Sequence, residues 1–203
     1  MKHLVRVFIL LVVIGLPAAA QAQVSGGVRA GVNLANLSGD PEPPVGFDTL
    51  TSLVAGAFVT VPVNEIFAFQ PEALYSRQGT KISDSGITAR TKLDYVQVPL
   101  LARVRTGAHS PLAILFGPSL GFRTGASLSA PGIPAEATEG FEDGFKTFDF
   151  GIAAGAEIGA GPLVFDARYT WGLTNILKDT FQGEPNSDKA KNRVLSLTAG
   201  LRF

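Results

Sequence analysis

The last eleven residues of the chain, 193–203, restrict its fold more than any other stretch. They read RVLSLTAGLRF, and in a β-strand their side chains would alternate between two faces. One face would be mostly small or polar, and the other wholly apolar, formed by Leu195, Leu197, Ala199, Leu201 and Phe203. About ten such residues are the length of a tilted strand that crosses a bilayer. The stretch therefore predicts a strand with hydrocarbon on one side and a polar interior on the other.

The first 22 residues are predicted to be a secretory signal peptide. Lys2 and Arg6 precede an apolar run, and the small-x-small sequence AQA follows the proline at position 17. The apolar run is shorter than the about twenty residues that a membrane-spanning helix needs. We therefore divide the chain into a signal peptide, residues 1–22, and one further domain, residues 23–203, whose fold is predicted below.

Charge and composition exclude several classes of protein. Without residues 1–22, the chain has 15 basic and 17 acidic residues, and this balance does not favour nucleic-acid binding. The absence of cysteine excludes disulfides, Cys-ligated metals and lipid attachment through an N-terminal Cys. The apolar residues are spread through short alternating segments rather than a helix-length run, which is the pattern of a transmembrane barrel.

Eight segments show this alternation, and together they predict an all-β fold. They are residues 27–35, 52–61, 66–78, 91–105, 112–123, 148–158, 163–173 and 193–203. Their connections alternate between long loops, at 37–50, 79–90, 124–146 and 175–192, and tight turns, at 62–65, 106–110 and 159–162. An up-and-down arrangement would place all long loops at one end, as in outer-membrane barrels. We therefore predict an eight-stranded antiparallel up-and-down transmembrane β-barrel in the bacterial outer membrane, with both termini in the periplasm.

Successive stretches of the chain also carry a family resemblance. They are GVRAGVNLANLSGD, FAFQPEALYSRQG, LDYVQVPLLARVR, LFGPSLGF, FDFGIAAGAEIG, DARYTWGLTNI and LSLTAGLRF. In this order they resemble the strand motifs of the PorT-like outer-membrane β-barrel family, often labelled porin-family proteins, over residues 26–203. The resemblance implies a fold and a membrane, but the family has no single assigned activity.

Three prolines, Pro71, Pro99 and Pro118, fall inside predicted strands. Proline lacks the N–H group that a strand ladder needs, so within a sheet it is usually found at edges or bulges. We therefore expect β-bulges to accommodate these residues. The family resemblance implies that they belong to its pattern.

The inward-facing positions carry the only clustered chemistry in the sequence. They include the basic residues Arg29, Arg103, Arg105, Arg168 and Arg202 and the acidic residues Glu72, Glu157 and Asp166. Most of them lie near the turn-side ends of their strands, so we expect a charged layer in the periplasmic half of the lumen. Because eight strands enclose a space just wide enough for side chains, we interpret the layer as a salt-bridged plug. The alternative is a constriction that selects small anions, since five Arg outnumber three carboxylates.

Other polar and aromatic residues have simpler interpretations. Tyr75, Tyr169 and Trp171 are expected in interfacial aromatic belts. The terminal Phe203 resembles the C-terminal insertion signal that the barrel-insertion machinery reads. The acidic loop residues Glu136, Glu139, Glu142 and Asp143 would either collect divalent cations that bridge to lipopolysaccharide or, as their irregular spacing favours, simply be solvated.

We expect no enzymatic activity, cofactor or metal site. An outer-membrane hydrolase with a Ser-His or Asp-His site needs a histidine beside its nucleophile or water. After residue 22 the chain has one histidine, His109, on a predicted periplasmic turn. A lone histidine on a turn is usually solvated.

The sequence thus predicts an integral outer-membrane barrel with a structural or loop-mediated binding role and a plugged lumen. Its expected partners are outer-membrane lipid, lipopolysaccharide and the barrel-insertion machinery, with no nucleic acid. Two alternatives remain: a narrow passive pore for small solutes or anions, and a soluble periplasmic lipocalin-like carrier with an apolar lumen. The carrier is disfavoured because the apolar face repeatedly excludes the charges.

Overall fold

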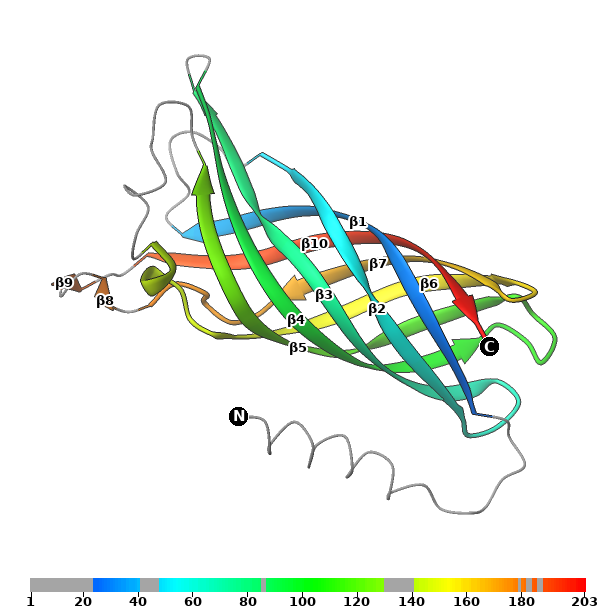
Figure 1. The fold of residues 1–203 in the computed structure, drawn as a ribbon. Helices are drawn as coiled ribbons and strands as arrows, with labels where there is room; N and C mark the ends of the chain where they lie inside the picture. Colours follow the sequence, from blue (N-terminus) through cyan, green and yellow to red (C-terminus); the bar gives the residue numbers. More distant parts are fainter. Residues whose placement is uncertain are drawn as a thin grey trace.

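The computed structural model is a closed antiparallel barrel of eight strands (Figure 1). The strands are β1 (Ser25–Asp40), β2 (Leu50–Pro62), β3 (Phe67–Asp84), β4 (Ile87–Arg105), β5 (Leu112–Ser129), β6 (Phe148–Ala160), β7 (Leu163–Gly172) and β10 (Lys189–Arg202). Neighbours in the barrel follow chain order, and β1 pairs with β10 to close it. Closure leaves no strand edge exposed to hydrocarbon, which cannot satisfy backbone N–H and C=O groups. The predicted fold class is confirmed.

The structure describes residues 24–40, 48–84, 87–129, 141–178, 180–181, 184–185 and 188–203. The predicted signal peptide lies outside these ranges. Within them, no helix has both the length and the hydropathy needed to span a bilayer. Three short elements accompany the barrel: the 3₁₀-helix η2 (Phe141–Gly144) and the two strands β8 (Thr180–Phe181) and β9 (Glu184–Pro185), which pair with each other.

The two faces of the barrel wall differ in polarity as the alternation predicts. Phe165 on β7 and Leu197 on β10 are exposed on the outer surface, whereas Asp166 and Arg168, on the opposite face of β7, are buried in the lumen. An apolar exterior around a charged interior suits hydrocarbon as the surrounding solvent. This polarity contradicts the lipocalin-like alternative, which requires an apolar lumen and a polar exterior.

The strands extend further at the long-loop end than we predicted. β3 and β4 run to Asp84 and from Ile87, so most of the predicted loop 79–90 is strand, and in Figure 1 this hairpin projects beyond the other strands. β5 likewise continues to Ser129, and β10 begins at Lys189 rather than at residue 193. The prediction was wrong there because outside the bilayer both strand faces are polar. Ladder hydrogen bonds then continue without the apolar alternation that revealed the membrane segments.

The three prolines do not produce the expected bulges. Beside each proline, the hydrogen-bonded ladder with one neighbouring strand is interrupted: the ladder with β2 beside Pro71, with β3 beside Pro99, and with β4 beside Pro118. Each ladder resumes in the same register after the gap. The other ladder of each strand continues through or next to its proline. Within the described strands, the register shifts only between Asp94 and Tyr95. Each proline, which lacks an N–H group, therefore causes only a local gap in one ladder, and the paired residues before and after the gap keep the register of the two strands.

Candidate functional site

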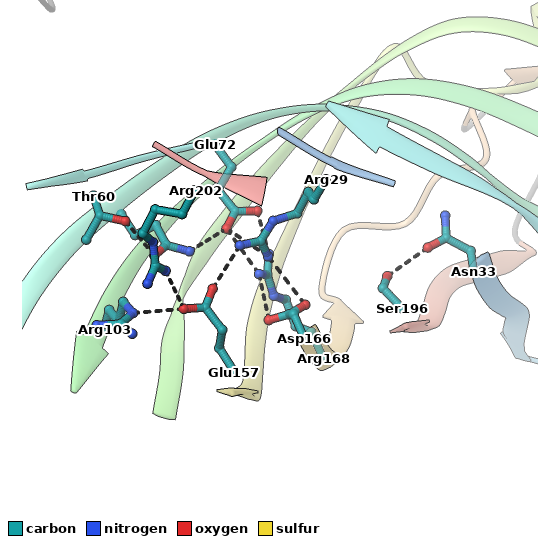
Figure 2. A network of polar contacts seen from close by, with 11 residues as sticks. Arg29, Asn33, Thr60, Glu72, Arg103, Glu157, Asp166, Arg168, Ser196 and Arg202 are labelled. Carbon is teal, nitrogen blue, oxygen red and sulfur yellow. Dashed lines mark hydrogen bonds and ion pairs between the residues drawn. The ribbon is translucent and has the colours of Figure 1, made fainter. Parts of the chain in front are cut away.

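Seven charged side chains meet inside the barrel and form one buried network (Figure 2). They are Arg29 on β1, Glu72 on β3, Arg103 on β4, Glu157 on β6, Asp166 and Arg168 on β7, and Arg202 on β10. Six of the eight strands therefore contribute a charge. Because each inward residue lies two or more positions from the next along its strand, only closure of the barrel brings the seven together.

Glu157 is the centre of one half of the network. Arg29 donates from Nη2 to its Oε2 at 2.9 Å, and Arg103 donates from Nε to its Oε1 at 3.0 Å. Arg202 donates from Nη2 to the same Oε1 at 2.6 Å. The Glu157 side chain is fully buried, so three guanidinium groups, rather than water, solvate this carboxylate.

Glu72 and Asp166 form the other half around Arg168. The Arg168 guanidinium contacts both oxygens of Glu72, at 2.8 and 3.1 Å, in the bidentate geometry that Arg favours with carboxylates. Its Nη2 also donates to Asp166 at 3.1 Å. Arg29 Nη1 lies 3.4 Å from Glu72 and 3.5 Å from Asp166, so Arg29 joins the two halves.

Neutral side chains complete this layer on the β2 side. Thr60 donates to Gln70 at 3.0 Å, and Gln70 donates to Glu72 at 2.9 Å. The ring of Phe58 lies 4.4 Å from the guanidinium carbon of Arg29, a cation–π distance. The lumen is therefore filled at this level by an ionic layer with an aromatic wall.

The charges of the network nearly balance. Four guanidinium groups face three carboxylates, and every carboxylate contacts at least one Arg. Moving charged groups from water into the barrel costs free energy. Once the network is assembled, removing one member is destabilising because it leaves another buried charge without its partner. The arrangement fits a rigid plug, since Arg29 and Glu157 each contact three partners that lie on three other strands.

Arg105, the eighth residue of the predicted network, does not join it. Its guanidinium donates to the backbone oxygen of Glu65 in the turn between β2 and β3. Arg105 is the last residue of β4, so its side chain reaches the rim of the barrel rather than the lumen. The prediction was wrong because alternation assigns the side of the wall but not the depth below the rim.

A neutral polar layer lies further toward the long-loop end. Asn33 donates to Ser76 at 2.9 Å and accepts from Ser196 at 2.7 Å, which links β1, β3 and β10 (the Asn33–Ser196 contact is seen in Figure 2). Beyond it, Asn192 donates to Asp149 at 2.7 Å, which links β10 and β6. These bonds bridge the lumen between strands that are not all neighbours in the barrel.

An apolar cluster, which we call the apolar cap, lies at the long-loop end of the barrel. We define it by its buried members Leu37, Leu93, Tyr95, Phe145, Ile176 and Ala190. Phe145 and Ile176 come from the segments that follow η2 and β7, and backbone hydrogen bonds tie Ile176 to Ala190 at 2.9 Å and to Lys146 at 2.7 Å. The sequence analysis missed this cap. The available signal was the presence of large apolar residues in stretches otherwise typical of polar loops.

The remaining predicted site residues lie outside the lumen. Tyr75 and Trp171 are partly exposed on the outer surface, and the rings of Tyr169 and Trp171 lie 4.6 Å apart. The terminal Phe203 is 80% exposed, and His109 is exposed on its turn.

The structure describes only part of the predicted acidic loop. Glu136, Glu139 and the Glu142 side chain lie outside what the structure describes, and Asp143 is exposed. Within the described ranges, no group of three His, Cys, Asp or Glu side chains is arranged to hold a metal ion.

The model of the family described as "Outer membrane protein beta-barrel domain" matches residues 19–178, which is more than half of the chain. This chain belongs to that family. It is accordingly a protein of the bacterial outer membrane, as the barrel polarity indicates. The curated proteins gave no match.

Solved structures of similar fold are outer-membrane proteins. The attachment invasion locus protein Ail of Yersinia pestis is 13% identical with a TM-score of 0.49, over 89% of this chain and 99% of Ail. Neisserial surface protein A is 16% identical with a TM-score of 0.49, over 89% of this chain and 97% of that protein. Outer membrane protein W of E. coli is 16% identical with a TM-score of 0.44, over 91% of this chain and all of that protein.

Proposed function

We propose that this protein is a sealed barrel that serves as an outer-membrane anchor and acts through its extracellular strand extensions and loops. The observation that carries the proposal is the buried ionic layer around Glu157 and Arg168, which fills the lumen with side chains from six strands. An eight-stranded barrel has little interior space beyond what such side chains occupy. The polar layer above it and the apolar cap add two further obstacles to a passing solute.

We propose neither catalysis nor conduction for this barrel. His109, the histidine on which a hydrolase site would depend, is exposed on a turn at the end opposite to the cap. The alternative function, a narrow pore, would need a continuous aqueous path through the lumen. The ionic network, the polar layer and the cap all occupy the lumen along this path. The order of the strand motifs further supports a place in the PorT-like group, with insertion signalled by Phe203.

Single-channel recording of the purified protein in planar bilayers tests the seal. We expect no steady open level with the unchanged chain, because the ionic network and the cap block the same lumen. Combining Glu72→Ser and Arg168→Ser with Asn33→Ser and Phe145→Ser shortens side chains in the ionic network, the polar layer and the cap without altering the net charge, and we expect steady currents from that variant.

The matched control replaces an ion pair on the outer surface. Arg77 Nε lies 2.7 Å from Asp94 Oδ1 on the outer face of β3 and β4. The double variant with Arg77→Ser and Asp94→Ser is expected to remain as silent as the unchanged protein. Steady open currents from the unchanged protein would show that the lumen conducts and would overturn the proposal.

A further inference from the structure

Seven cations gather on the outer surface of the barrel at its extracellular end. They are Arg77 and Lys81 on β3, Arg90 and Lys92 on β4, and Lys189, Lys191 and Arg193 on β10. Their strand neighbours Gln78, Thr80, Leu93, Ala190 and Asn192 are buried in the barrel. Because side chains alternate along a strand, the seven face outward. We call this set the basic collar.

The basic collar begins where the lipid-facing band ends. Arg77 follows Tyr75 at the next outward position, and Arg193 pairs across the ladder with Trp171. Successive outward positions are about 6.6 Å apart along a strand. The collar therefore starts within one such step of the interfacial aromatics and continues away from the hydrocarbon, at the depth of the lipid head groups.

Like charges stand next to one another in the collar. Lys81 and Arg90 are direct cross-strand partners, and Lys189, Lys191 and Arg193 occupy consecutive outward positions of β10. Such neighbours repel unless an anion lies between them. Acidic residues also neighbour the collar: Asp94 forms an ion pair with Arg77, Asp48 pairs with Lys81 through the backbone, and Asp40 is the cross-strand partner of Lys189. Seven cations outnumber these three acidic residues. The collar thus has a clear excess of positive charge.

Among the residues that the structure describes, the opposite rim of the barrel has no such excess. Arg105 lies there, and its guanidinium contacts the backbone of Glu65 in the same turn. The cations outside the lumen are therefore concentrated on the side of the outer leaflet. In the outer membrane that leaflet carries phosphorylated glycolipid, and lipid head groups lie at the level of the interfacial aromatics and just beyond them.

We propose that the basic collar binds the phosphate groups of outer-leaflet glycolipid. Both arms of the collar, β3–β4 and β10, present three or more cations to the membrane surface, so each can neutralise a phosphate cluster on a different side of the barrel. The site lies outside the wall and does not depend on whether the lumen is sealed.

Binding of purified lipid A to the detergent-solubilised protein tests this proposal, with diphosphorylated lipid A, its dephosphorylated form and phosphatidylglycerol as the three probes. Two triple variants each remove three cations. One carries Lys81→Gln, Arg90→Gln and Lys92→Gln and keeps Arg77, which is paired with Asp94. The other carries Lys189→Gln, Lys191→Gln and Arg193→Gln. We expect the unchanged protein to prefer diphosphorylated lipid A at least about tenfold over either other probe. Each triple variant should lower that affinity about tenfold or more, and added salt should weaken it.

Two controls separate charge from folding. Arg105→Gln removes a cation from the opposite rim and should leave the affinity unchanged, whereas Lys→Arg changes at positions 81, 92, 189 and 191 keep the charge and should keep binding. If a triple variant fails to fold, the probe preference and salt dependence of the unchanged protein still decide. Equal binding of phosphorylated and dephosphorylated lipid A, equal binding of phosphatidylglycerol, or full binding by a folded triple variant would each overturn the proposal.

Discussion

Replacing Glu157 by glutamine should lower the free energy of unfolding by about 3–5 kcal/mol. The change keeps the shape of the side chain but removes the one carboxylate that Arg29, Arg103 and Arg202 share. Arg103 and Arg202 would then lose the carboxylate that they contact, and Arg29 would keep only its longer contacts with Glu72 and Asp166. A buried charge that loses its partner retains its full desolvation penalty, which is why this change is more damaging than its small size suggests.

Denaturant unfolding in lipid vesicles, followed by the fluorescence of the single tryptophan, Trp171, measures this loss. The matched control is Asp94→Asn, which removes a carboxylate from the partly exposed pair with Arg77. Exposed pairs contribute at most about 1 kcal/mol, so the control should change stability little. If Glu157→Gln were no more destabilising than Asp94→Asn, the network would not hold the barrel together as we describe.

Replacing Gly31 by valine should prevent closure of the barrel in most molecules. Gly31 lies on the inner face of β1, and a Cβ atom there would be 2.0 Å from the Leu197 backbone oxygen and 2.7 Å from the Thr198 Cα. Both atoms belong to β10, the strand on which β1 closes the barrel. Because the obstacle is backbone held by a hydrogen-bonded ladder, it cannot move aside as a flexible side chain would. We expect a loss of at least about 3 kcal/mol.

The neighbouring residue provides the control. Ala30 faces lipid and borders an open hollow of the outer surface, so Ala30→Val adds apolar volume where there is room. Heat-dependent migration on gels and circular dichroism report the folded fraction of both variants. A normally folded Gly31→Val protein would show that β1 and β10 can separate enough to admit a side chain, contrary to the close approach described here.

Much of the barrel could be predicted because its evidence is local. A strand in a membrane wall must place apolar groups outside and polar groups inside, and each strand shows that pattern within about ten residues of sequence. An apolar residue next to a charged one already indicates which face of the wall each side chain occupies, as with Phe165 and Asp166 or Leu201 and Arg202. Seven of the eight charges assigned to the lumen are found together for the same reason.

Prediction failed where the solvent on the outer face changes. Beyond the hydrocarbon, Lys92 and Lys191 replace apolar residues at outward positions, so the sequence there is typical of loops although the ladders continue. The alternation also does not show how far from the rim a side chain lies. Arg105 occupies an inward position of its strand, but its side chain lies at the rim. The cap was missed because Phe145 and Ile176 come from segments without periodicity.

The sequence by itself determined the number of membrane strands, the side of the wall that each residue faces and the charges available to the lumen, because alternation is a property of neighbouring residues. Only the tertiary structure decided which charges meet. Arg29 and Glu157 are 128 residues apart, and their contact depends on how far each strand is staggered when the barrel closes. The same closure brings the segments after η2 and β7 to the mouth of the barrel, where Phe145 and Ile176 join the apolar cap.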